Sequence, residues 1–384
     1  MNILWIFDNP LNPEAGGTER VSFLVMQGLK SRGHTCLGHL VIDQNTGVCN
    51  YDGKIVDDLF DFLIIHNINI VVNQKAQDCE FLRMFLMLGG QRWKNQGGKI
   101  ISCLHFNPQP VSEYYDIKVL WPKSFKKMAL LLRAKFFPKL VEHRQRMRTK
   151  EVFQYIYDNS DIFLLLTETH LSYLKNLLDI DNVNKLQVIP NPLTFQHIID
   201  HNQLQQKKDI AVFVGRMDEY YKRISIILKS WKLLQDDSRF SNWELKIIGD
   251  GPCLEAYKKY ALDNKLKNVW FEGRCNPEAY YKEAKIFLMT SISEGLPMTI
   301  LESFQNGVVP IVIDTCPVFH EIVSNGFNGV VCHSDGYRDY VKAIKSIMCD
   351  NNKYNELARN AICTASEYTT EHIIDKWQEI ITGL

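Results

Sequence analysis

Short continuous runs of apolar residues recur along the first half of the chain, and segments with helical spacing separate them. The first run, Ile3–Phe7, is typical of a parallel strand that is buried on both faces. Similar runs follow at 37–42, 68–72, 99–104, 161–166 and 186–189. This alternation predicts an open, mostly parallel α/β sheet.

The same pattern starts again near residue 210. It predicts helices at 224–234, 254–262 and 278–284 and strands at 210–214, 245–249, 269–271, 286–290, 309–313 and 330–331. With 384 residues, the chain exceeds the usual size of a single core. Between the halves, Val188-Ile-Pro-Asn-Pro-Leu193 and the polar run 201–208 indicate an interdomain connector. The sequence therefore predicts two α/β domains, at 1–200 and 208–367.

One stretch of the second half combines a strand, an acidic loop and the start of a helix. The strand pattern at 286–290 leads into a loop that holds Glu294. Pro297 suits the first position of a helix, because a helix leaves that N–H group unpaired anyway. The helix is predicted to end at Asn306-Gly307. Its N-terminus offers free N–H groups and a partial positive charge, which suit a phosphate.

Two glutamates of this stretch, Glu294 and Glu302, lie eight residues apart. In one continuous helix this spacing separates two residues by roughly 12 Å, which is too far for a paired acid and base. We interpret them as two groups that bind hydroxyls along one extended ligand. A phosphate between two such groups suggests a nucleotide-sugar.

Other predicted strand ends in this half also carry polar or flexible residues. Gly215-Arg216, with Lys222 at the start of the next helix, places two cations beside one strand end, which suits a diphosphate. The turns Gly249-Asp-Gly-Pro252 and Phe271-Glu-Gly-Arg-Cys275 allow a ligand close to the backbone. Several such turns together are a stronger signal than any one of them.

The first half has two candidate positions. Gly16-Gly17 lies between a predicted strand and helix, where the backbone can approach a ligand, although a plain tight turn explains the pair equally well. His105 follows the fourth predicted strand, at the edge where ligands of such sheets bind. By position alone, a structural histidine is the alternative.

The composition argues against several classes of function. Lys and Arg number 44, as do Asp and Glu, so the net charge indicates no partner. The 10 cysteines include no C-x-x-C pair, which favours core residues in a reducing compartment over disulfides or zinc. Met1–Phe7 has the pattern of a strand and not of a signal peptide, and no apolar run reaches about 18 residues. We expect a cytoplasmic protein without a metal site.

Residues 118–150 differ from the rest, with 11 lysines and arginines against one acid, Glu142. Apolar and aromatic residues are interleaved with these cations. Such a stretch suits an anionic membrane surface, which predicts a peripheral position on the inner face of the cell membrane. A solvated basic helix is an equal alternative. Nucleic acid is a lesser one, because no recognised binding motif accompanies the cations.

Taken together, these motifs resemble the family 4 glycosyltransferases (glycosyl transferases group 1), which are retaining enzymes. The resemblance rests on the Gly215, Gly249, Phe271 and Glu294–Glu302 motifs, with weaker support from Gly16-Gly-Thr-Glu-Arg20 and Val188-Ile-Pro-Asn-Pro192. It implies a GT-B fold, with two Rossmann-like domains facing a central cleft. It also implies that the helix at 368–384 packs back on the first domain.

The resemblance further implies roles for single residues. Glu302 would bind the ribose, and Glu294 the transferred sugar. Arg216 and Lys222 would neutralise the leaving diphosphate, although Lys222 lies one residue later than is familiar and Arg223 could substitute. The remaining implied donor-binding residues are Gly16, Gly17, Gly215, Arg274, Cys275, Gly295, Leu296, Pro297 and Met298, with His105 as an active-site histidine.

The predicted function is therefore retaining transfer of a sugar from a nucleotide-sugar, namely a UDP-sugar, to a glycan or lipid-linked acceptor in cell-surface polysaccharide synthesis. The family is described as metal-independent, so no cofactor is expected. A nucleotide-sugar epimerase of the same fold and a non-catalytic glycan-binding protein are the alternatives.

Overall fold

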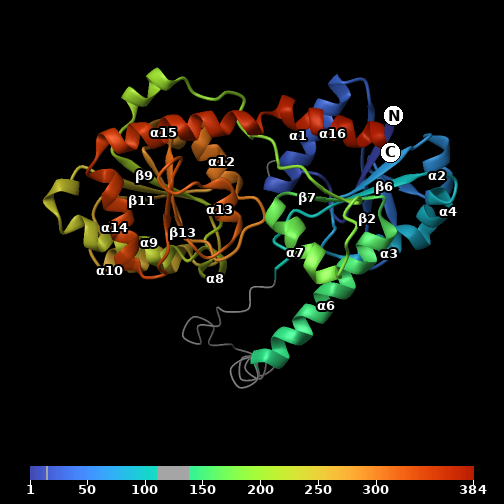
Figure 1. Cartoon of the computed structure of the whole chain (residues 1–384), viewed down its shortest axis with the longest axis horizontal. Coiled ribbons are helices and arrows are strands. Elements are labelled where there is room, and N and C mark those ends of the chain that lie inside the picture. Colours follow the sequence, from blue (N-terminus) through green and yellow to red (C-terminus); the bar gives the residue numbers. More distant parts are fainter. Residues whose placement is uncertain (14–15, 110–137) are drawn as a thin grey trace. The chain divides into compact units, whose positions relative to one another are not determined.

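The computed structural model describes residues 1–13, 16–109 and 138–384, and it divides into two compact units (Figure 1). Among the described residues, unit 1 contains 1–109, 138–192 and 370–384, and unit 2 contains 193–369. Residues 118–137 of the predicted basic segment 118–150 lie outside the described residues. No described helix is both long enough and apolar enough to cross a membrane.

Unit 1 is built on a mostly parallel sheet with the strand order β4-β3-β2-β1-β5-β6-β7-β8. Antiparallel pairing involves β3, which pairs in this way with β2 and with β4 at one edge. The strands are β1 (Asn2–Phe7), β2 (Thr35–Ile42), β3 (Cys49–Tyr51), β4 (Lys54–Val56), β5 (Ile70–Asn73), β6 (Lys99–Cys103), β7 (Ile162–Leu165) and β8 (Leu186–Val188).

Helices cover both faces of this sheet (Figure 1). Leu4 and Ile6 of β1 belong to a core that includes α2, α3, α4, α6 and α7, whereas α1 packs against α16. The helices are α1 (Gly17–Ser31), α2 (Leu59–Ile65), α3 (Cys79–Phe85), the π-helix η1 (Leu86–Gly90), α4 (Gln91–Lys94), α6 (Pro138–Asn159), α7 (Glu168–Leu178) and α16 (Thr370–Gly383).

Unit 2 contains a second parallel sheet, with the order β11-β10-β9-β12-β13-β14. The chain enters at the central strand β9, builds one side of the sheet and then returns to build the other side from β12. The strands are β9 (Ile210–Val214), β10 (Glu244–Ile248), β11 (Val269–Gly273), β12 (Ile286–Met289), β13 (Val309–Ile313) and β14 (Val330–Cys332). This order is that of a Rossmann-type sheet, whose ligands bind where the strand order reverses.

The helices of unit 2 also lie on both faces of its sheet (Figure 1). Helix α9 packs against α14, and α12 packs against α15. The helices are η2 (His201–Gln206), α8 (Glu219–Lys222), α9 (Ile224–Gln235), η3 (Ser238–Phe240), α10 (Leu254–Asp263), α11 (Glu278–Glu283), α12 (Met298–Gln305), α13 (Val318–Ile322), α14 (Tyr337–Met348), α15 (Asn351–Ala365) and η4 (Ser366–Tyr368).

The boundary between the two units lies at residues 192 and 193, earlier than the end of the predicted range 1–200. The segment 193–207 belongs to unit 2, because Ile199 and Leu204 are buried in the core of that unit. Helix α16 belongs to unit 1, where the side chain of Ile374 lies against Gly28 of α1. Arg32 and Asp375 join the same two helices by an ion pair of 2.5 Å.

Candidate functional site

The point where the strand order of unit 2 reverses lies between β9 and β12, and polar residues follow both strands. Gly215-Arg216 comes directly after β9, and the loop with Glu294 follows β12. Lys222, at the end of α8, links the segment after β9 to the loop after β12, because its Nζ lies 2.5 Å from Oε1 of Glu294. The Lys222 side chain is 23% exposed and that of Glu294 is 15% exposed, so this ion pair is well shielded from water.

Thr290, at the end of β12, fixes the backbone around Lys222. Its hydroxyl donates to the carbonyl of Lys222 at 2.6 Å. Arg223 follows in the left-handed conformation, with φ 50°, and is buried. Its guanidinium donates to the carbonyl of Thr290 at 2.8 Å and to Asp335 at 3.0 Å. Lys222, and not Arg223, is therefore the cation that contacts Glu294.

The turns after β9 and β10 are in direct backbone contact. The amide of Gly215 donates to the carbonyl of Ile248 at 3.0 Å, and that of Met217 donates to Asp250 at 2.9 Å. A Cβ atom on Gly249 would lie 1.9 Å from the carbonyl oxygen of Gly215, so only glycine fits there. The contact fixes the backbone of Arg216, whose side chain is exposed and forms no ion pair within the described part of the chain.

Helix α12 begins at Met298, one residue later than predicted, and Pro297 is its N-cap. Proline has no side-chain acceptor, so the N-cap side chain makes no capping hydrogen bond to this helix. Gly295 and Leu296 complete the loop before it. Because Glu294 precedes the helix, the spacing of roughly 12 Å that we predicted from a continuous helix does not apply.

Glu302 is 5% exposed and lies on α12. Its Oε1 accepts a hydrogen bond of 2.7 Å from the hydroxyl of Thr194, 108 residues away in the sequence. The Tyr281 hydroxyl, which donates to the carbonyl of Thr299 at 3.2 Å, is also buried, and burial together with the charge of the Glu302 carboxylate raises the pKa of Tyr281 well above its usual value. The sequence analysis did not identify Thr194 or Tyr281, because both are distant in the chain and carry no motif.

Arg274 and Cys275 follow β11 and are exposed. The carbonyl of Gly273, which precedes them, accepts from the amide of Gly249 at 2.8 Å. These residues therefore lie at the same sheet edge as Arg216, two strands from β9. Within the described residues, no group of three or more histidines, cysteines or acids is arranged to hold a metal ion.

The remaining predicted residues, Gly16, Gly17 and His105, belong to unit 1. Gly16 is the N-cap of α1, and Gly17 is its first residue. A Cβ atom on Gly16 would meet only the flexible end of Glu19, so packing within unit 1 does not require glycine there.

His105 lies after β6, and its Nε2 is hydrogen-bonded to Oε1 of the buried side chain of Gln74. Its Nδ1 is buried and has no hydrogen-bond partner among the described residues. Burial lowers the pKa of His105 from 6.5 to about 4, so the imidazole is neutral near pH 7. The side-chain oxygen of Gln74 can only accept a hydrogen bond, so Nε2 of His105 carries the proton.

The buried imidazole predicts a pH-dependent stability. Unfolded chains bind more protons than folded ones between pH 4 and 6.5, because the pKa of His105 is about 4 in the fold. The free energy of unfolding should therefore fall as the pH decreases through this range. Relative to His105→Gln, we expect an additional loss of about 1 to 3 kcal/mol, measured by urea unfolding at pH 7 and pH 4.5. Equal losses in both proteins would contradict the assignment.

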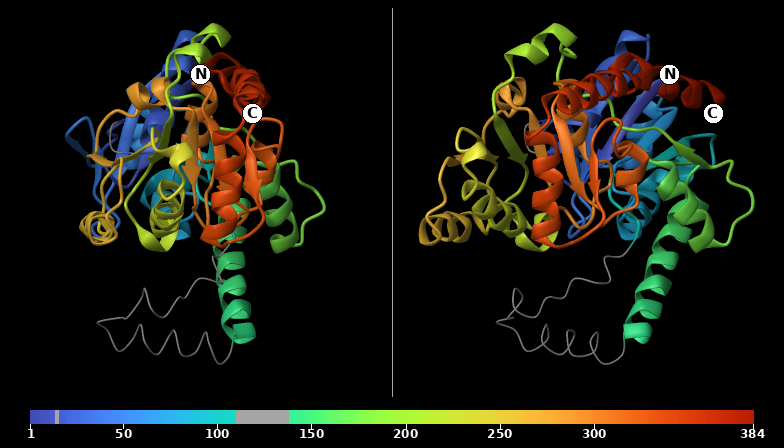
Figure 2. Two further views of the ribbon diagram at one scale, coloured as in Figure 1. Left: turned by 90° about the vertical axis from the view of Figure 1, so that its left-hand side faces the viewer. Right: turned by 60° about the vertical axis from the view of Figure 1, so that its left-hand side comes forward.

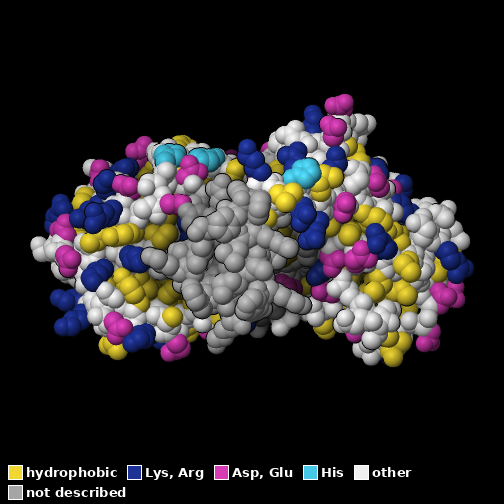
Figure 3. All heavy atoms as spheres, turned by 90° about the horizontal axis from the view of Figure 1, so that it is seen from below, with side chains coloured by type: hydrophobic (Ala, Val, Ile, Leu, Met, Phe, Trp, Pro, Cys, Tyr) yellow, Lys and Arg dark blue, Asp and Glu magenta, His cyan; other side chains and the backbone are white. Residues whose placement is uncertain are grey.

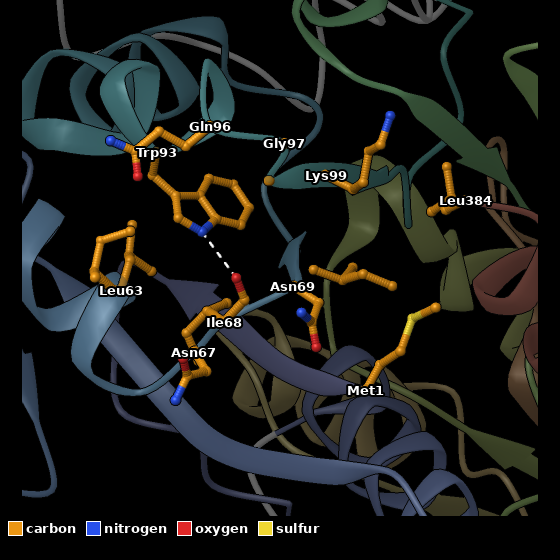
Figure 4. A pocket seen from close by; sticks show the side chains of 13 residues that line it. Met1, Leu63, Asn67, Ile68, Asn69, Trp93, Gln96, Gly97, Lys99 and Leu384 are labelled. Atoms are coloured by element: carbon orange, nitrogen blue, oxygen red, sulfur yellow. Dashed lines mark hydrogen bonds between the residues drawn. The ribbon is translucent and has the colours of Figure 1, made fainter.

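A hollow of about 410 Å³ lies at the opposite edge of the unit 1 sheet, beside the amino ends of β1, β5 and β6 (Figure 4). Its lining mixes apolar and polar groups and includes Trp93, whose indole N–H donates to the carbonyl of Ile68 at 2.9 Å. None of the predicted site residues lines it. Since ligands of open α/β sheets bind at the carboxyl ends of strands, this hollow is separate from the candidate site.

Comparisons with known proteins agree with this arrangement. Residues 195–363 match the model of the family described as "Glycosyl transferases group 1". A GalNAc-transferring enzyme of Campylobacter jejuni, named as a GalNAc-alpha-(1->4)-GalNAc-alpha-(1->3)-diNAcBac-PP-undecaprenol alpha-1,4-N-acetyl-D-galactosaminyltransferase, is 26% identical over 52% of this chain and 55% of its own. The amylovoran biosynthesis glycosyltransferase AmsD of Erwinia amylovora is 25% identical over 59% of this chain and 64% of its own. The match thus spans less than two thirds of either relative.

Among solved structures, Anabaena HepE in complex with UDP-glucose matches the whole of both chains, with a TM-score of 0.71 and 13% identity. The lipopolysaccharide outer core galactosyltransferase WaaB also matches over the full length of both chains, with a TM-score of 0.66 and 16% identity. At such identities the likeness concerns the fold. Residues 195–363 thus resemble the glycosyl transferases group 1, and the fold of the chain is that of the GT-B glycosyltransferases.

Proposed function

We propose that this protein transfers a sugar from a UDP-sugar to a glycan or lipid-linked acceptor, with retention of anomeric configuration, in the synthesis of a cell-surface polysaccharide. The shielded contact between Lys222 and Glu294, at the reversal point of the unit 2 sheet, is the observation that carries the proposal. A UDP-glucose complex of a protein with the same fold supports the choice of donor. The lipid-linked glycan in the name of the Campylobacter relative supports the choice of acceptor.

The chemistry follows from charge. As the bond to the sugar breaks, negative charge develops on the leaving diphosphate. Arg216 lies exposed after β9, and Lys222 lies nearby with its ammonium directed at Glu294. Both cations and the N-terminus of α12 favour the departing diphosphate, so they lower the barrier by electrostatic stabilisation. This proposal requires no metal ion.

The two glutamates have distinct positions in this scheme. Glu294 neutralises Lys222 in the free protein and accepts a hydroxyl of the transferred sugar when the diphosphate takes over the lysine. Glu302 is buried, and the hydroxyl of Thr194 donates to it. A carboxylate has about four acceptor positions, so Glu302 retains capacity for the hydroxyls of the ribose.

Retention is proposed to result because the acceptor hydroxyl attacks the sugar from the same face that the diphosphate leaves. The leaving diphosphate accepts the proton of this hydroxyl. We assign no protein nucleophile. Relatives named as an alpha-1,4-N-acetyl-D-galactosaminyltransferase and a poly(glycerol-phosphate) alpha-glucosyltransferase support an α product. We expect NMR of the product formed from an α-linked UDP-sugar to show an α linkage. A β-linked product would contradict retention.

The same assay separates the alternatives. An epimerase converts the nucleotide-sugar without any acceptor, so it would yield an altered sugar still attached to UDP. A non-catalytic glycan-binding protein would yield no product and would not depend on Arg216. We expect neither result. Calorimetry should detect UDP binding that is weakened in a Glu302→Gln variant, because that carboxylate is proposed to bind the ribose.

We further propose that unit 1 binds anionic membrane surfaces through the start of α6, which extends beyond the neighbouring helices of its unit (Figures 1 and 2). Leu140 and Met147 are 49% and 44% exposed there. Exposed cations lie around them, namely Lys139, Arg144, Arg146 and Arg148. On the face that Figure 3 shows, positively and negatively charged side chains are mixed.

Vesicle binding tests this surface. The full chain is expected to bind phosphatidylglycerol vesicles, and binding should weaken as salt is raised. Each cation near such a surface contributes about 1 kcal/mol, so Arg144→Gln with Arg146→Gln should weaken partitioning by about 30-fold in a sedimentation assay. The matched control changes two exposed cations of unit 2, Lys258 and Lys259, and should leave partitioning unchanged. Equal effects of the two variants would refute the proposal.

A further inference from the structure

The sheet of unit 1 has a reversal point of its own, between β1 and β5. Strand β1 pairs with β2 on one side and with β5 on the other, and both pairs are parallel. Asp8 directly follows β1, and Lys75 lies two residues after β5. The Nζ of Lys75 is 2.6 Å from Oδ2 of Asp8, and the side chains are 23% and 26% exposed. This ion pair therefore lies at the sheet edge where open α/β sheets bind ligands.

A buried polar network fixes the backbone of Lys75. The amide of Lys75 donates to Oδ1 of Asn73 at 2.9 Å, and Nδ2 of Asn73 donates to the hydroxyl of Ser102 at 3.1 Å. The hydroxyl of Ser160 donates to Ser102 at 2.7 Å. All three polar side chains are fully buried, which is costly unless their bonds are satisfied. Here the network determines how the chain leaves β5 and thus where Lys75 lies.

The pair has a counterpart in unit 2. Lys222 and Glu294 also join the two strands at a reversal point, their contact is 2.5 Å, and their exposure is similarly low. The backbone of Lys222 is likewise held by a buried side chain, Thr290, at a strand end. By contrast, the pair Lys208–Glu283, which precedes the same two strands at the amino edge of the sheet, is 61% and 51% exposed.

We propose that Asp8 and Lys75 form a binding subsite for the acceptor sugar, in which they bind neighbouring hydroxyls of a neutral glycosyl residue. This inference rests on the proposed function in so far as the ligand is an acceptor glycan. The carboxylate accepts from one hydroxyl, and the ammonium donates to the next. Because the pair has no net charge, it suits a neutral diol better than a phosphate. Neither residue belongs to the motifs that carry the family resemblance.

Saturation-transfer NMR with the full chain tests the subsite through small glycosides that stand in for the acceptor. The probes are the methyl glycosides of glucose, galactose, N-acetylglucosamine and N-acetylgalactosamine, with UDP at saturation. We expect at least one glycoside to give a signal with the unchanged protein. Asp8→Asn and Lys75→Met should each reduce that signal at least fivefold, whereas UDP affinity by calorimetry should stay within twofold.

Lys99→Met is the matched control, because Lys99 pairs with Asp161 at 3.4 Å at the amino end of β6, on the opposite edge of the same sheet. It should retain the full signal. No glycoside signal with the unchanged protein, or signals that survive both substitutions, would overturn the subsite. Displacement of the glycoside by inorganic phosphate would show an anion site instead. If the unchanged protein does not bind UDP, the result counts against the proposed function, and not against the subsite alone.

Discussion

Replacing Lys222 by methionine is expected to lower kcat for sugar transfer by about 10²- to 10³-fold. The expectation follows from the position of its ammonium, 2.5 Å from Glu294 in a site that is largely shielded from water. Removing one group that stabilises developing charge in such a site typically costs that much. The variant also leaves the carboxylate of Glu294 without its partner, which should weaken donor binding further. Steady-state kinetics with a UDP-sugar would measure both effects.

Two further variants give this prediction its control. Lys208→Met removes an exposed lysine that pairs with Glu283 at 2.7 Å in the same unit, and it should change kcat by less than twofold. Lys222→Met combined with Glu294→Gln removes the unpaired carboxylate and should restore thermal stability without restoring activity. Recovery of activity in this double variant would show that Lys222 only balances the charge of Glu294.

Gly249→Ala is expected to destabilise the protein by at least about 3 kcal/mol and to abolish UDP binding. Gly249 has a φ of 136°, and the new methyl group would lie 1.9 Å from the carbonyl oxygen of Gly215. The backbone must move to accept it, in addition to the cost of an unfavourable φ. Since Gly215 precedes Arg216, that movement displaces a cation proposed to bind the diphosphate. Urea unfolding and calorimetry with UDP would measure the two losses.

Gly273→Ala separates the steric effect from the effect of φ. Gly273 has a φ of 71°, and no described atom lies within 4 Å of the position of its Cβ. The Gly273→Ala substitution should therefore lower the free energy of unfolding by only about 1 to 2 kcal/mol, and the variant should still bind UDP. If the two substitutions were equally destabilising, the close approach between the turns after β9 and β10 would not be what requires glycine at 249.

Most strands were predictable because parallel strands buried on both faces appear as continuous apolar runs. The prediction lacks the hairpin formed by β3 and β4, whose strands have only three residues each, with exposed side chains in β4. Its turn, Asp52-Gly53, does carry a signal: both residues have positive φ, and Asp-Gly is a preferred pair in such turns. Several helices of unit 2, including α14 and α15, were not predicted either.

The candidate site was predictable as far as its residues lie at strand ends. The motifs place Arg216, Lys222 and Glu294 after β9 and β12, and the strand order explains why Lys222 and Glu294 meet. The choice between Lys222 and Arg223 needed the fold, because it depends on the left-handed backbone of Arg223. The roles assigned to the donor-binding residues remain predictions.

Side-chain partners from distant parts of the chain could not be predicted. Thr194 reaches Glu302 across 108 residues, and Gln74 reaches His105 across 31. Both partners are common polar residues without a local motif, and only packing brings them to their places. Their contacts change how the motif residues are understood, because Glu302 is already hydrogen-bonded and both ring nitrogens of His105 lie within unit 1.

The place of α16 in unit 1 has a consequence for biosynthesis. This helix follows residues 193–369 in the chain, yet Ile374 and Trp377 bury their side chains within unit 1. At about 5–20 residues per second, a ribosome needs roughly 10 to 35 seconds to translate the intervening unit. During this time the nascent first unit exposes the apolar face of α1 that α16 later covers. That interval is when chaperones have access to this face, and unit 2 is free to fold before unit 1 is complete.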